Sequence, residues 1–85
     1  MRVSVSNPYT DDIITLNMAP KDRITRVKYN ISLKLGLYDD TGFVLIHNDT
    51  VPDTGTRLCE LYPSTPLPPH IHMKMVLSVR SGFVI

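Results

Sequence analysis

The sequence predicts a small α+β fold, a mixed four- to five-stranded sheet with one main helix packed across it. Apolar residues alternate with period two near both ends of the 85-residue chain, and one amphipathic helical stripe lies between those ends. A helix that buries its stripe on one face of a sheet is a stable arrangement of this kind. The first and last strands are expected to pair side by side and to bury Val3, Val5, Met73 and Met75 against the helix.

The N-terminal segment predicts a β-hairpin. Residues 3–6 and 13–18 each alternate apolar and polar side chains, and the stretch between them is rich in turn formers. Pro20 ends the second strand, because proline has no backbone N–H to donate to a sheet.

The next segment predicts a helix of three to four turns. Four apolar residues at spacings of three, four and four share one helical face: Ile24, Val27, Ile31 and Leu35. Asp22 is the expected N-cap, and Gly36 stands where a left-handed C-terminal cap is needed. This is the strongest single element in the sequence.

The second half of the chain predicts short strands separated by turns. Residues 43–46 are rich in strand formers, and the Asn48-Asp49 pair that follows is typical of a turn. Residues 56–61 are expected to hold one helical or 3₁₀ turn. Pro63–Pro69 form a stiff, extended loop, which is a candidate second contact surface. Residues 73–80 form the closing strand.

Composition places the chain among single intracellular domains. Apolar residues make up 42% and charged residues 20% of the chain, and the formal charge is +1. That balance predicts no general attraction to nucleic acid or to an anionic membrane. The apolar runs are too short for a membrane-spanning helix. The single Cys59 fits a reducing compartment, so we expect a cytoplasmic or nuclear location.

The chain offers no predicted catalytic residue, metal site or cofactor site, because a core this small leaves little room for a water-excluding cleft. His70 and His72 can share one face of a strand, a spacing that can bind zinc. Yet no carboxylate or second cysteine lies at ligand spacing, so with His47 they are interpreted as solvated side chains. Cys59 lacks an activating base and is interpreted as a small buried core residue.

The order and spacing of these segments resemble ubiquitin over almost the whole chain. The likeness is carried by Ile14-Thr15-Leu16, Pro20-Lys21-Asp22, the helix stripe with Gly36-Leu37, Val44-Leu45-Ile46, Asp53 with Leu58, and residues 73–82. Membership of the ubiquitin-like superfamily implies a β-grasp fold over residues 1–82, with residues 83–85 as a tail or the start of a linker. The resemblance also implies an ion pair between Lys28 of the helix and Asp53 of the later turn, the alternative being a solvated lysine.

The C-terminal end departs from ubiquitin. Ubiquitin-type modifiers end in an Arg-rich tail with two glycines, whereas this chain has Arg80-Ser81-Gly82 followed by three further residues. The departure implies a non-conjugated domain, the N-terminal module of a larger protein. Two alternatives stay open, a covalent modifier processed after Gly82 and a purely structural module.

The resemblance also implies a surface for protein partners. Ubiquitin docks receptors through an apolar patch, and the matching positions here are Tyr9, Leu45, Lys74 and Val76. Leu45 and Val76 are expected on the solvent face of the sheet, because side chains alternate along a strand. Lys74, His47 and Asp49 are expected to tune selectivity at the rim. The predicted function is therefore a monomeric, non-enzymatic module that docks receptors of the ubiquitin-pathway or proteasome type.

Overall fold

The computed structural model describes residues 1–37 and 42–77. In chain order the elements are β1 (Arg2–Asn7), β2 (Asp12–Asn17), α1 (Ile24–Leu35), β3 (Phe43–Ile46), the 3₁₀ helix η1 (Leu58–Leu61) and β4 (His70–Leu77). Residues 78–85 lie outside the described residues, and with them the end of the predicted closing strand, the domain boundary at residue 82, the processing site at Gly82 and the tail.

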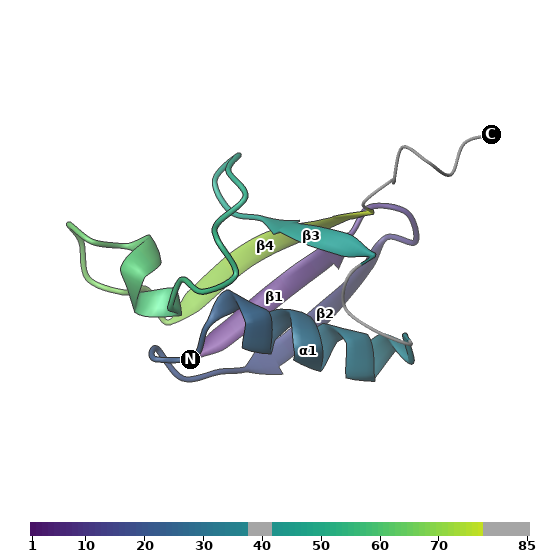
Figure 1. The fold of residues 1–85 in the computed structure, drawn as a ribbon, viewed down its shortest axis with the longest axis horizontal. Coiled ribbons are helices and arrows are strands. Elements are labelled where there is room, and N and C mark those ends of the chain that lie inside the picture. The colour runs from purple at the N-terminus through teal and green to yellow at the C-terminus, as the bar shows by residue number, and fades with distance from the viewer. Residues whose placement is uncertain (38–41, 78–85) are drawn as a thin grey trace.

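The four strands form one mixed sheet in the order β2-β1-β4-β3. β1 pairs with β2 antiparallel and with β4 parallel, and β3 pairs with β4 antiparallel. α1 lies across one face of this sheet (Figure 1). The predicted α+β class, with a mixed four-stranded sheet and one helix, is confirmed, and so is the pairing of the first and last strands. The arrangement is compatible with a β-grasp.

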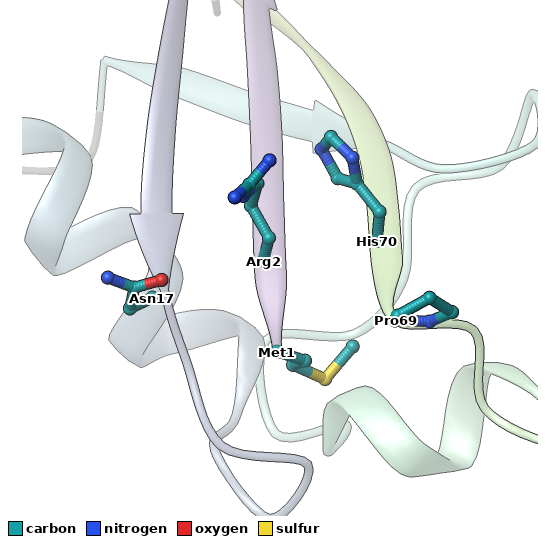
Figure 2. A pocket seen from close by; sticks show the side chains of 5 residues that line it. All are labelled: Met1, Arg2, Asn17, Pro69 and His70. Carbon is teal, nitrogen blue, oxygen red and sulfur yellow. The ribbon is translucent and has the colours of Figure 1, made fainter.

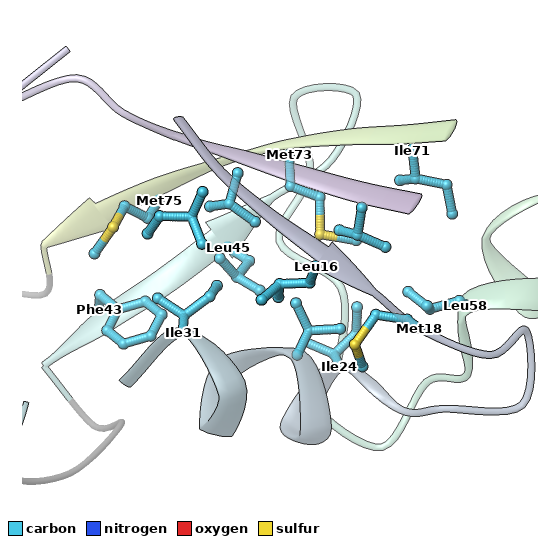
Figure 3. Close-up of a cluster of buried hydrophobic side chains, with 14 residues drawn as sticks. Leu16, Met18, Ile24, Ile31, Phe43, Leu45, Leu58, Ile71, Met73 and Met75 are labelled. Atoms are coloured by element: carbon cyan, nitrogen blue, oxygen red, sulfur yellow. The ribbon is translucent and has the colours of Figure 1, made fainter. Parts of the chain in front are cut away.

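The core lies between the sheet and α1 (Figure 3). β1 contributes Val3 and Val5, and the partner strands place buried side chains directly opposite them. The residues of this cluster are Val3, Val5, Ile14, Leu16, Met18, Ile24, Val27, Ile31, Phe43, Leu45, Leu58, Ile71, Met73 and Met75. The inward side chains of the strands and the apolar stripe of α1 therefore pack together in one apolar layer. Leu35, the last predicted stripe residue, is 38% exposed on the final turn of α1.

The start of α1 differs from the prediction. Arg23 is the N-cap and makes no side-chain capping bond. Asp22 instead closes the preceding turn, where its Oδ2 accepts a hydrogen bond of 2.7 Å from the backbone N–H of Ala19. The first N–H groups of α1 donate to carbonyl oxygens of the later chain, Ile24 to Thr56 and Thr25 to Thr54. The helix N-terminus is thus capped by the loop before η1, a partner that local sequence does not show.

The end of α1 matches the prediction, and Gly36 adopts the left-handed conformation at φ 70°. We expect Gly36→Ala to lower the free energy of unfolding by about 1–2 kcal/mol, because a Cβ strains this conformation although no atom lies within 4 Å of it. Urea denaturation measures the loss. Gly55→Ala is the matched control, since it also has open space but no positive φ. Equal effects of the two changes would contradict a backbone origin.

The segment between β3 and β4 is tied down at several points. Asn48 and Asp49 have φ values of 50° and 64°, as in a type I′ turn, and His47 bridges to Thr50 across it. The predicted turn at these two residues is confirmed, and η1 confirms the 3₁₀ turn. The proline-rich loop is also anchored. Leu67 packs against the core, and the Pro69 carbonyl accepts a 3.0 Å hydrogen bond from the N–H of Arg2.

Within the described residues, no helix combines the length and the hydropathy needed to span a membrane.

Candidate partner-binding face

The sheet has a second face, opposite the core, which we call the outer face. Successive side chains of a strand point to opposite sides, so the residues that alternate with the core residues lie here. They are Arg2, Ser4 and Ser6 of β1; Ile13, Thr15 and Asn17 of β2; Val44 and Ile46 of β3; and His70, His72, Lys74 and Val76 of β4. The register pairs them in rows across the strands.

One end of the outer face is aliphatic. Val44 stands opposite Val76, and Ile46 stands opposite Lys74, on the neighbouring strands β3 and β4. Val44, Ile46 and Val76, which we call the aliphatic patch, are half-buried and are not part of the core cluster. The row through Ile46 continues over Lys74 and Ser6 to Ile13 of β2, which is 68% exposed. Apolar surface therefore lies on both sides of a central lysine.

The predicted position of Leu45 on the solvent face is wrong. Leu45 is 2% exposed and lies in the core opposite Met75. β3 buries its first and third residues, so Val44 and Ile46 point outward instead. The run of four apolar residues at 43–46 carries no polar alternation from which the side of each residue could be read, and a shift of one residue exchanges the two faces.

His47 was expected at the rim of the patch, and this is also wrong. Its side chain is 5% exposed, and its Nε2 lies 2.8 Å from the Tyr62 hydroxyl in a hydrogen bond. The two rings meet edge to face, with centroids 5.3 Å apart. Burial lowers the pKa of His47. Because His47 follows the buried Leu45 by two residues, it lies on the same side of the chain and its polar ring needs an internal partner.

The other predicted contact residues are accessible. Lys74 and Asp49 are exposed, Val76 is half-buried, and Tyr9 is 57% exposed in the turn between β1 and β2. Lys74 and Asp49 line one hollow of about 380 Å³, which the sequence did not predict, together with Ser6, Ile46, Asn48, His72 and Met73. The turn that carries Tyr9 lies beside the C-terminal end of β4 (Figure 1). The structure thus brings Lys74 and Asp49 together with Ile46, rather than with Leu45.

The opposite end of the outer face is polar and was not predicted. His70 and His72 were interpreted as solvated, and His72 is exposed, whereas His70 is half-buried. Both belong to β4, and their rings stack with centroids 4.1 Å apart. His70 Nε2 is hydrogen-bonded to the Ser4 hydroxyl at 2.6 Å, and Ser4 is itself buried. The period-two spacing of the histidines was a usable signal, but the serine is 66 residues away in the chain.

The histidines and Cys59 do not form a cluster of metal ligands in the described part of the chain. No group of three or more His, Cys, Asp or Glu side chains gathers there. Cys59, which was expected in the core, is exposed.

The ion pair implied between Lys28 and Asp53 does not form within the described residues. The Lys28 ammonium lies over the Phe43 ring at 5.3 Å from its centroid, a cation–π contact with the core. Asp53 Oδ1 faces its own turn and accepts from the N–H of Gly55 at 3.5 Å. The lysine therefore finds an aromatic partner in place of a carboxylate.

No protein-family model matches this chain, and no curated protein matches it.

Proposed function

We propose that this chain is a ubiquitin-like, β-grasp interaction domain that docks a partner protein through the aliphatic patch. The sheet order, the single helix across it and the sequence resemblance to ubiquitin support the fold assignment. The observation that carries the function is the outward placement of Val44, Ile46 and Val76, since aliphatic side chains gathered on a sheet face outside the core favour protein contact. The receptors we propose are of the ubiquitin-pathway or proteasome type.

The geometry revises which residue is central to the patch. The resemblance gave that place to Leu45, but the residue that faces Lys74 across the strands is Ile46. Lys74 is exposed between Ile46 and Ser6, so its ammonium is available to a partner carboxylate. A fitting partner therefore presents an apolar segment to Val44, Ile46 and Val76, with an acidic residue beside Lys74.

Combined replacement of Ile46 and Val76 by alanine tests the proposal. The full chain carrying both changes is compared with the unchanged chain in affinity capture, and the recovered partner is then titrated directly. We expect the Kd to rise at least about tenfold, because side chains at the centre of an interface carry most of its binding energy.

Leu33→Ala is the matched control, because Leu33 is 61% exposed on α1, across the core from the outer face. It should leave binding unchanged. Docking would be assigned to another surface if the same partners still bound the double variant. The same conclusion would follow if Leu33→Ala weakened binding as much as the double replacement. Thermal unfolding of each variant separates lost binding from lost folding.

A further inference from the structure

Three hydrogen-bonding side chains form one row across the polar end of the outer face. Arg2 of β1 stands opposite Asn17 of β2 on one side and opposite His70 of β4 on the other. Neighbouring strands lie about 4.8 Å apart, so the backbone positions that carry this guanidinium, amide and imidazole span about 10 Å. Arg2 and Asn17 are exposed and His70 is half-buried. The row offers donors to a ligand and carries one fixed positive charge.

The next row of the sheet adds polar groups and no carboxylate. The next row holds Thr15, Ser4 and His72, which add hydroxyls and a second imidazole. None of the outer-face residues of the described strands is acidic. The chain as a whole is nearly neutral, with nine basic and eight acidic side chains. The charged side chains on this face, Arg2 and Lys74, are therefore both basic, which favours anions over cations.

The row borders a hollow of about 450 Å³ at the start of β1 and β4. Figure 2 shows Arg2, Asn17 and His70 on three neighbouring strands, with Met1 and Pro69 at the strand ends. The Met1 side chain lies toward Pro69, so the two form an apolar border below the polar row. The hollow thus combines donors for an anion with a surface for an uncharged organic group.

The contact with Ser4 holds His70 in either protonation state. A neutral Nε2 accepts a hydrogen bond from the Ser4 hydroxyl, and a protonated Nε2 donates to it. Partial burial lowers the pKa of His70, and the charges of His72 and Arg2 lower it further. An anion in the hollow would offset the repulsion from those two groups, so ligand binding and proton uptake by His70 should support each other.

We propose that this hollow binds a small phosphate monoester, whose oxygens accept hydrogen bonds from Arg2, Asn17 and His70 and whose organic group rests on Met1 and Pro69. A phosphoryl group has three terminal oxygens, one for each donor in the row, whereas a carboxylate has two. The site lies at the opposite end of the outer face from the aliphatic patch and does not depend on the function proposed for that patch.

Titration of the full chain with phenyl phosphate, inorganic phosphate and benzoate, followed by NMR, tests the ligand class. We expect saturable shifts at Arg2, Asn17 and His70, with a Kd for phenyl phosphate on the order of 1 mM, as suits a shallow site. Inorganic phosphate and benzoate should bind several-fold more weakly. Benzoate binding as tightly would overturn the phosphate assignment. Equal binding of inorganic phosphate would overturn the role given to Met1 and Pro69.

Three substitutions test the residues. Arg2→Gln should weaken phenyl phosphate about tenfold and Asn17→Ala about threefold, since each removes a donor. Lys74→Gln is the matched control, because it removes one charge from the same face two rows away. It should change the Kd less than twofold. Equal weakening by Lys74→Gln, or no weakening by Arg2→Gln, would overturn the site. Asn17 is exposed, so its variant should keep its fold.

Sulfate, which does not titrate near neutral pH, isolates the role of His70. Its affinity should rise as the pH falls from about 7.5 to 5.5, because imidazolium adds a charge and a donor beside Arg2. His70→Gln should flatten this rise. An unchanged pH profile in the variant would remove His70 from the site.

Discussion

Replacing Leu45 with alanine is expected to lower the free energy of unfolding by about 2–5 kcal/mol. The side chain is 2% exposed and lies in the core opposite Met75, so its removal leaves a cavity beneath the sheet as well as losing apolar burial. Chemical denaturation with an unchanged m-value measures the loss. In a domain of this size, whose total stability is of the order of 5–15 kcal/mol, such a change can unfold a large fraction of the protein.

Val44→Ala is the matched control, because it shortens the adjacent side chain on the opposite face of the same strand. Val44 is half-buried, so the expected loss is about 1 kcal/mol or less. If Val44→Ala were the more damaging change, the inward and outward sides of β3 would be reversed and Leu45 would return to the partner surface. Comparing the two variants therefore decides whether Leu45 or Val44 faces the core.

Removing the Tyr62 hydroxyl is expected to cost about 1–3 kcal/mol, because Tyr62→Phe leaves the buried Nε2 of His47 without its partner. The shape of the ring is retained, so its edge-to-face packing on His47 is unchanged in this variant. Thermal and urea unfolding measure the loss. Tyr29→Phe is the control, since Tyr29 is 52% exposed on α1, and it should shift stability by less than about 0.5 kcal/mol.

The same buried pair gives stability a dependence on pH. The pKa of His47 is lower in the folded protein than its ordinary value of 6.5. Below pH 6.5 the unfolded chain therefore binds more protons at this residue than the folded chain, so the free energy of unfolding falls as the pH decreases. His70 shifts in the same direction and adds to the slope. Replacing His47 with glutamine should reduce the slope, and an unaltered slope would show that His47 titrates normally.

The parts of the fold that could be predicted are those with a clear period. Two patterns identified the core-facing side without ambiguity. They are the alternation of residues 3–6 and 13–18 and the helical spacing of Ile24, Val27 and Ile31. The 43–46 strand was recognised, but its inward side was not, because all four residues are apolar. The resemblance to ubiquitin then placed Leu45 outward, one residue away from Ile46.

The polar contacts could not be predicted, because their partners are distant in the chain. Asp22 has the residue type of a helix cap, yet the N-terminus of α1 is satisfied by Thr54 and Thr56. His47 contacts Tyr62 only when the segment after η1 packs beside the end of β3, and Ser4 contacts His70 only when β1 and β4 pair. Local patterns fix the elements, whereas side-chain pairing depends on how those elements meet.

The parallel pairing of β1 with β4 has a consequence for synthesis of the chain. The β1–β2 hairpin and α1 can form as soon as the first 35 residues have left the ribosome, but β4 begins only at His70. Until β4 is made, one edge of β1 has no neighbouring strand. In the complete fold, β1 is a central strand of the sheet. A nascent or truncated chain therefore exposes an open strand edge with the apolar layer beneath it, which is a template for aggregation. Once β4 has formed, it pairs with that edge of β1. The last strand of the sheet therefore protects the first strand from pairing with another chain.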